Sequence, residues 1–106
     1  MSDSVTCTFV SFLFFHVGDG NFHTLLLIDN EDADEVSRAE HFVAWLNETA
    51  IALDGTCTGE HGIGQGKRPY LQAELGPALR YMAAIKTALD PDNIMNPGKI
   101  ISDDMV

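Results

Sequence analysis

Apolar residues change their spacing near residue 30, which predicts strands before that point and helices after it. Residues 5–15 are rich in β-branched and aromatic types on both alternating faces. This pattern is typical of a central strand covered on both sides. A dense turn signal at 18–21 (GDGN) separates it from a second apolar segment, 22–28. We therefore predict two strands joined as a hairpin or a tightly turned β-β unit.

Helical spacing begins after the second strand. Asp29-Asn30 is expected to cap this helix, because these side chains accept hydrogen bonds from free backbone N–H groups. Acidic residues follow in the first turns, where the helix dipole favours them, and Gly55 is expected to end the helix. Its apolar residues recur at alternating three- and four-residue spacing, which predicts one stripe packed on the sheet: Val36, Ala39, Val43, Leu46, Ala50 and Leu53.

A glycine-rich segment, 55–68, follows the helix and contains five glycines. It predicts a loop in which the backbone closely approaches another group. A short helix is expected at 69–75, and another from Pro77 to the Asp90-Pro91 stop signal. The apolar stripe predicted for this last helix is Ala78, Met82, Ile85 and Leu89.

We expect the tail, 91–106, to be mostly irregular. The order of elements predicts an α+β fold, a small antiparallel sheet with packed helices, in a single domain over 1–106. A two-stranded sheet is marginal alone, and an exposed strand edge tends to pair. We therefore expect a homo-oligomer, or a chain that is part of something larger.

Composition narrows the classes of function. The chain of 106 residues is 45% hydrophobic, enough for a core, and its net charge of −10 argues against nucleic-acid binding. The longest apolar run, 9–15, is too short to cross a membrane, and the N-terminus resembles no targeting signal. Cys7 and Cys57 lie far apart in the sequence, so free thiols are the default, with a single disulfide as the alternative.

Two histidines flank the predicted turn. If the turn reverses the chain, the imidazoles of His16 and His23 return to one another and suit zinc or another first-row divalent ion. The alternative is a pair of polar hairpin residues that contact solvent or cap the turn. His41 has no such context, since it lies on the predicted helix beside the apolar stripe, and we interpret it as structural or solvated.

Glu60 and His61 form a second cluster, within the glycine-rich loop. Adjacent residues in extended backbone point to opposite sides, so one can face a metal while the other faces a bound molecule. The alternative is an exposed carboxylate beside a hydrogen-bonded histidine. The loop fits neither nucleotide motif, because Arg68 stands where a Walker loop needs Ser or Thr, and Lys67 where the dinucleotide motif needs Gly.

Three motifs in this order resemble a known family: HVGDGNFH at 16–23, GTCTGEHGIGQGKR at 55–68 and LDPDNIMNPGKI at 89–100. Together they are similar to the C-terminal domain of FAD-linked oxidases of the vanillyl-alcohol-oxidase type. Within that group the likeness is to enzymes acting on D-2-hydroxy acids: cytochrome-type D-lactate dehydrogenase above all, with the glycolate oxidase flavin subunit and D-2-hydroxyglutarate dehydrogenase as relatives.

The resemblance implies a role for each matching residue. His16, His23 and Glu60 match metal ligands for zinc or manganese, and His61 matches the catalytic base. A 2-hydroxy acid would chelate the cation, lose its hydroxyl proton to His61 and transfer hydride to FAD. With less weight, Asn96 and Lys99 are expected near the flavin. The placement of positive charge in the second part of the chain suggests Lys67 and Arg68 for the substrate anion.

The flavin-binding domain of such enzymes has no counterpart in the sequence. We therefore expect FAD to be bound mainly by a domain outside the chain, no turnover by the chain alone, and association with a flavin-binding chain or with further copies. Relatives are mitochondrial or bacterial and membrane-associated, which leaves the compartment open. Two alternatives are a non-catalytic metal-binding remnant that associates with another chain, and a small metallohydrolase.

Overall fold

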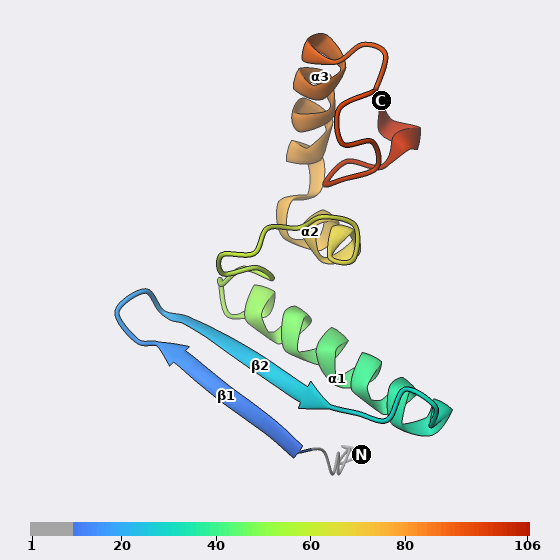
Figure 1. Ribbon diagram of the computed structural model, residues 1–106. Coiled ribbons are helices and arrows are strands. Elements are labelled where there is room, and N and C mark those ends of the chain that lie inside the picture. Colours follow the sequence, from blue (N-terminus) through green and yellow to red (C-terminus); the bar gives the residue numbers. More distant parts are fainter. Residues whose placement is uncertain (1–9) are drawn as a thin grey trace. The chain divides into compact units, whose positions relative to one another are not determined.

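The computed structural model describes residues 10–106 (Figure 1). Its contacts divide the chain into two compact units, with the boundary between Leu46 and Asn47. The described part contains a two-stranded antiparallel sheet and helices, which confirms the predicted α+β class. The elements, in chain order, are β1 (Val10–His16), β2 (Asn21–Leu27), α1 (Ala33–Ala52), α2 (Arg68–Leu75), the 3-10 turn η1 (Gly76–Ala78), α3 (Leu79–Leu89) and the 3-10 turn η2 (Asp103–Met105).

The first unit is built on a β-hairpin. β1 and β2 pair in antiparallel register from Val10 opposite Leu27 to His16 opposite Asn21. The reversal is tightened by a hydrogen bond from the backbone N–H of Asp19 to the carbonyl oxygen of His16, at 3.0 Å. The predicted hairpin is therefore confirmed, whereas the part of the first predicted strand at 5–9 lies outside the described residues.

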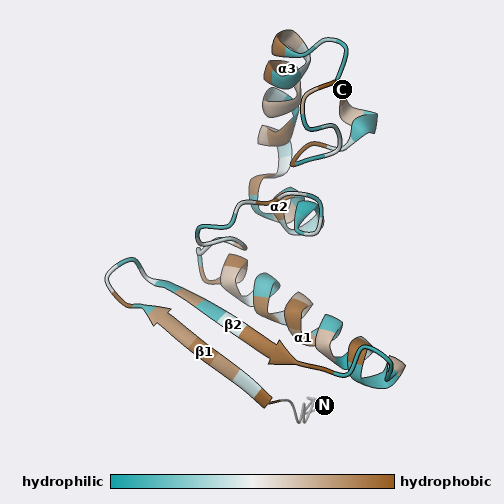
Figure 2. Ribbon diagram, in the orientation of Figure 1, coloured by the Kyte–Doolittle hydropathy of each residue, from teal (hydrophilic) through white to brown (hydrophobic). Residues whose placement is uncertain are grey.

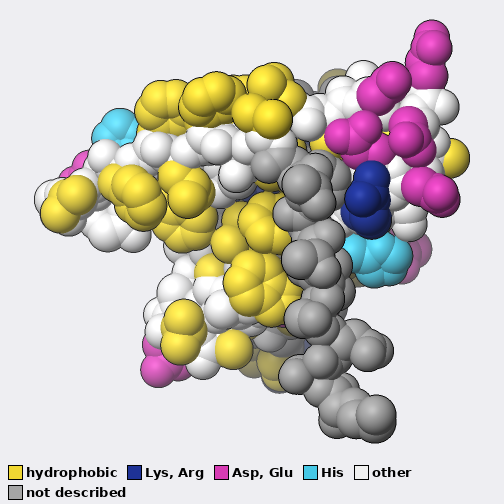
Figure 3. Space-filling view, turned by 90° about the horizontal axis from the view of Figure 1, so that it is seen from below, with side chains coloured by type: hydrophobic (Ala, Val, Ile, Leu, Met, Phe, Trp, Pro, Cys, Tyr) yellow, Lys and Arg dark blue, Asp and Glu magenta, His cyan; other side chains and the backbone are white. Residues whose placement is uncertain are grey.

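The prediction that the first strand is covered on both sides is wrong for its described part. Every residue of β1 is exposed, including Phe12 and Phe15 at 50% and 64%. Figure 2 shows the apolar character of β1, and Figure 3 shows hydrophobic side chains at the surface. The pattern predicted cover on both faces, but within the described residues β1 pairs only with β2 and its side chains are exposed.

α1 begins later than predicted because Asp32 caps it. The carboxylate of Asp32 accepts hydrogen bonds from the N–H groups of Asp34 and Glu35, at 3.0 and 3.2 Å. Asp29, the expected cap, instead accepts a bond from the N–H of Glu31 and forms a turn ahead of the helix. Several acidic residues able to cap a helix follow one another here. Asp32 is the cap because residues 29–32 form a turn, closed by the hydrogen bond from the N–H of Asp32 to the carbonyl oxygen of Asp29.

The end of α1 lies near Gly55, as predicted, for a steric reason. The N–H of Gly55 bonds to the carbonyl oxygen of Ala50 at 2.8 Å, and a Cβ at position 55 would lie 2.8 Å from that oxygen. The predicted apolar stripe is only partly buried: Ala39 is buried, whereas Val43 and Leu53 are 40% and 77% exposed. Leu53 is exposed because the helix has already ended at Ala52.

The second unit has a small core between α2, α3 and the C-terminal segment. Its buried members are Leu71, Leu79, Ala83 and Ile101, and two partly buried residues pack against them: Ile63 and Met82. The stripe predicted for α3 was therefore mostly wrong. Ile85 and Leu89 are 61% and 79% exposed, and Ala78 is exposed as well. The helix instead presents Leu79 and Ala83 to the core, because Leu71 and Ile101 lie on that side.

The C-terminal segment is mostly irregular, as predicted, but it is tied to the unit at both ends. After α3, Asp90 pairs with Lys86 and accepts hydrogen bonds from the N–H groups of Ile94 and Met95, at 3.0 and 2.9 Å. Further on, the N–H of Ile100 bonds to the carbonyl oxygen of Gly64 at 2.7 Å. The segment therefore returns to the glycine-rich loop and places Ile101 in the core.

Candidate functional site

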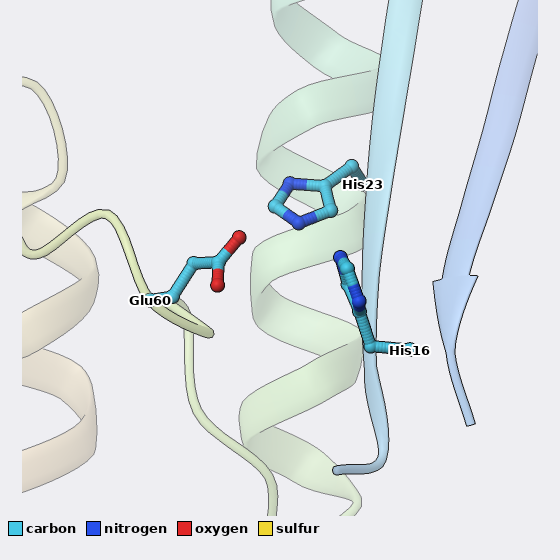
Figure 4. Close-up of side chains that lie close together, drawn as sticks. All are labelled: His16, His23 and Glu60. Atoms are coloured by element: carbon cyan, nitrogen blue, oxygen red, sulfur yellow. The ribbon is translucent and has the colours of Figure 1, made fainter. Parts of the chain in front are cut away.

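The hairpin brings the two predicted metal-binding histidines together. His16 lies at the end of β1, and His23 on β2 is paired with Phe14, so both side chains project from the same face of the sheet. Their ring centroids are 5.1 Å apart, at an interplanar angle of 82° (Figure 4). His16 is exposed and His23 is half-buried. The predicted convergence of these two imidazoles is confirmed.

The spacing of the two rings suits a shared ion. With zinc–nitrogen bonds of about 2.0–2.1 Å and tetrahedral geometry, two bound imidazoles have centroids about 5 Å apart. The observed separation of 5.1 Å agrees with this value. Neutral imidazole nitrogen is a common ligand for zinc and other first-row metals. The hairpin alone therefore holds two imidazoles at the spacing that two ligands of one tetrahedral ion would have.

Glu60 and His61 lie in the loop between α1 and α2, and both are exposed. The hydroxyl of Thr58 donates a hydrogen bond to the carbonyl oxygen of Gly62 at 3.1 Å, and so closes a short bend around this pair. Gly62 has φ of +78°, a left-handed conformation that glycine adopts without strain. At this position the glycine of the motif is explained by the turn itself.

The loop is anchored ahead of this bend at Cys57. The side chain is buried and the thiol is free. Burial raises the pKa of the Cys57 thiol, and its hydrogen bond to the Glu74 carboxylate raises it further. Burial also acts to raise the pKa of Glu74, but hydrogen bonds from the N–H of Cys57 and the hydroxyl of Thr56 outweigh it and leave that pKa below its ordinary value. Cys57 is therefore a packed thiol beside a charged carboxylate.

The cations predicted to bind the substrate anion both make contacts within their own unit. The ammonium group of Lys67, which is half-buried, donates to the carbonyl oxygen of Cys57. The guanidinium of Arg68 donates to the carbonyl oxygens of Gln65 and Gly98, at 3.3 and 3.0 Å. These bonds hold the loop to helix α2 and to the C-terminal segment. A role in substrate binding stays a prediction for both residues.

Asn96 and Lys99 lie in the turn of the NPGK motif. Asn96 has φ of +47°, and the ammonium group of Lys99 donates to the carbonyl oxygen of Pro97 at 3.2 Å. Their predicted place near the flavin stays a prediction. His41 is an exposed residue of α1 with its Nδ1 2.8 Å from the carbonyl oxygen of Ser37, as expected for a structural histidine.

Comparison with known proteins connects these features. The profile of the family described as FAD linked oxidases, C-terminal domain, matches residues 2–100. The chain belongs to this family. It is 56% identical over 87 residues to the probable mitochondrial D-lactate dehydrogenase of Danio rerio, and 46% identical over 101 residues to the mitochondrial cytochrome D-lactate dehydrogenase of Arabidopsis thaliana. It is also 47% identical over 103 residues to the glycolate oxidase subunit GlcD of Bacillus subtilis.

The chain spans only about a fifth of the length of those relatives. The three alignments cover 81%, 94% and 96% of the chain but only 18%, 17% and 21% of the respective relatives. One of these relatives is named as a mitochondrial protein, and another comes from a bacterium. Among the described residues, no helix combines the length and the apolar character needed to cross a membrane.

Proposed function

We propose that the chain is the substrate- and metal-binding part of an FAD-dependent dehydrogenase that oxidises D-2-hydroxy acids such as D-lactate. His16, His23 and Glu60 hold a Zn²⁺ or Mn²⁺ ion, and His61 is the catalytic base. The observation that carries this proposal is the pair of imidazoles 5.1 Å apart on the hairpin. The substrate class rests on the names of the relatives, which include D-lactate dehydrogenases and D-2-hydroxyglutarate dehydrogenase.

The donor set supports a single cation with open positions. Two imidazole nitrogens, from His16 and His23, and a carboxylate oxygen, from Glu60, are ligand types that zinc and manganese accept. Bound to one tetrahedral ion at about 2.0–2.2 Å, the three ligand atoms would lie about 3.4 Å apart. Two imidazoles and a carboxylate leave at least one coordination position for a substrate, as catalytic zinc sites do.

The chemistry assigned to the chain is proton removal and substrate positioning. A cation supplies Lewis acidity, which lowers the pKa of a bound hydroxyl group. His61 follows Glu60 directly in the chain and is exposed, so its ring can reach a molecule held beside the cation site. A ring nitrogen of His61 accepts the hydroxyl proton, and general-base catalysis of this kind contributes about 10²–10⁴-fold to rate.

FAD supplies the two-electron acceptor when it is bound. Only Asn96 and Lys99 are proposed to approach it from this chain, and both lie in an exposed turn. We propose that residues outside the chain bind most of the flavin, because the segment that matches is only 18% and 17% of the length of two related enzymes. The chain then contributes the metal ligands, the catalytic base and part of the substrate pocket.

Calorimetric titration of the purified chain with MnCl₂ tests the metal site. We expect one ion per chain, and Glu60→Gln weakens binding by more than the roughly 10–100-fold that loss of an outer-shell partner costs, because a charged ligand is lost. Glu48→Gln, a matched change at an exposed carboxylate of α1, should leave the affinity unaltered. Equal Mn²⁺ affinity of the wild type and Glu60→Gln would show that Glu60 is not a ligand of the ion.

Titration of the Mn²⁺-loaded chain with small acids tests the substrate class. D-lactate should bind more tightly than propionate, which lacks the hydroxyl group that completes the chelate. Equal binding of the two acids would contradict chelation by a 2-hydroxy acid. A chain that binds Mn²⁺ but shows no preference among acids would instead support the non-catalytic metal-binding remnant.

A further inference from the structure

We propose that Glu74 is a positioning residue that fixes the loop carrying Glu60 and His61. The inference rests on the proposed function, because it concerns the same site. Glu74 lies on α2 and acts through Cys57, which comes three residues before Glu60. Lys67 also holds Cys57, through a hydrogen bond to its carbonyl oxygen.

The contacts of Glu74 converge on one segment of the loop. A single carboxylate oxygen accepts hydrogen bonds from the hydroxyl of Thr56 at 3.1 Å and from the N–H of Cys57 at 3.2 Å. An ionised carboxylate has no proton to donate and accepts several bonds at once. Glu74 therefore binds one donor from each of two consecutive residues.

Lys67 completes the attachment of Cys57. Its ammonium group donates to the carbonyl oxygen of Cys57, while Glu74 accepts from the N–H of the same residue. The backbone of Cys57 is thus held on both sides by groups of opposite charge. Hydrogen bonds to charged groups are roughly twice as strong as those between uncharged partners. The side chain of Cys57 is 4% exposed, so packing adds to this hold.

The fixed point lies immediately before the functional pair. The hydroxyl of Thr58, the next residue, bonds to the carbonyl oxygen of Gly62 at 3.1 Å and encloses Glu60 and His61 in a short bend. The base of this bend is attached to Cys57 directly through the chain. A displacement of Cys57 is passed on to the bend, because Cys57 is joined by a peptide bond to Thr58, whose hydroxyl closes the bend at Gly62. Metal sites lose affinity when residues that orient their ligands are removed, usually by about 10–100-fold.

Two measurements on the full chain test the inference. The first is the Mn²⁺ dissociation constant of Glu74→Ala and Glu74→Gln, with Glu48→Ala as the matched change at an exposed glutamate. We expect about tenfold weaker binding for Glu74→Ala, a smaller loss for Glu74→Gln, whose amide oxygen still accepts, and none for Glu48→Ala. The second is amide hydrogen exchange over residues 57–62, which should speed up in Glu74→Ala and not in Glu48→Ala.

The outcomes separate this inference from the proposed function. Absence of Mn²⁺ binding by the wild type refutes the proposed metal site, whereas the exchange measurement still decides whether Glu74 fixes the loop. Wild-type affinity in Glu74→Ala, or unchanged exchange over 57–62, overturns the positioning role. Should Glu74→Ala lose its helical circular dichroism, Lys67→Met decides in its place with about tenfold weaker binding expected, and Glu74→Gln with its smaller loss. Wild-type affinity or unchanged exchange in both variants then overturns the positioning role.

Discussion

Truncation of Leu79 tests the core that supports the glycine-rich loop. Leu79 begins α3 and is 4% exposed, in contact with a cluster against which Ile63 of the loop packs. Leu79→Ala removes three buried carbons, worth about 2.4 kcal/mol of transfer free energy at 0.8 kcal/mol each. The cavity left behind raises the cost to about 3–4 kcal/mol. We expect urea denaturation, followed by circular dichroism at 222 nm, to show a loss of this size.

Leu89→Ala is the matched control. The same three carbons are removed from the same helix, but Leu89 is 79% exposed. The expected loss is therefore about 0.5 kcal/mol or less. Equal destabilisation by the two substitutions, or none by Leu79→Ala, would refute the placement of the core between α2, α3 and the C-terminal segment.

Three further predictions concern acid stability, assembly and activity. Hydrogen bonds from Lys86 and from the N–H of Met95 hold the pKa of Asp90 below its ordinary value, so its contribution to stability is complete above about pH 4 and is lost as the pH falls through the lowered pKa. Urea titrations at pH 7 and pH 3 should show this acid loss in the wild type and a smaller one in Asp90→Asn; parallel losses would contradict it. Because β1 is apolar and exposed, we expect a homodimer or larger species in sedimentation experiments at micromolar concentration, and Phe12→Lys should shift it towards monomer; a monomeric wild type would count against this. The purified chain alone should not reduce a dye with D-lactate, and turnover with bound flavin would show that it needs no further domain.

Local sequence signals predicted the hairpin and the meeting of its histidines. The turn residues at 18–21 require a reversal, and a reversal there returns His23 to His16 whatever surrounds it. Gly55 was predictable for a similar reason, since its position at the helix end depends on neighbouring backbone. Features set within a few residues of the chain were therefore available from the sequence.

Features set by distant partners were not. Ala83 and Ile85 belong to two different apolar rows along α3, each at helical spacing. Which row is buried depends on Leu71 and Ile101, which pack against one side of the helix. The contact of Glu74 with Cys57 links residues 17 apart in the sequence, and no sequence motif predicts it. The exposed faces of β1 were misread because its composition suits a covered strand, and composition does not say what covers it.

The most direct test of the central claim is X-ray absorption spectroscopy of the zinc-loaded chain. The claim is that His16, His23 and Glu60 bind one divalent ion, and it predicts one zinc per chain with two imidazole nitrogens and a carboxylate oxygen in its first shell. His23→Asn should reduce the imidazole signature from two rings to one, whereas His41→Asn, a change at the structural histidine of α1, should preserve it. Zinc bound through sulfur, or a spectrum indifferent to His23→Asn, would contradict the claim.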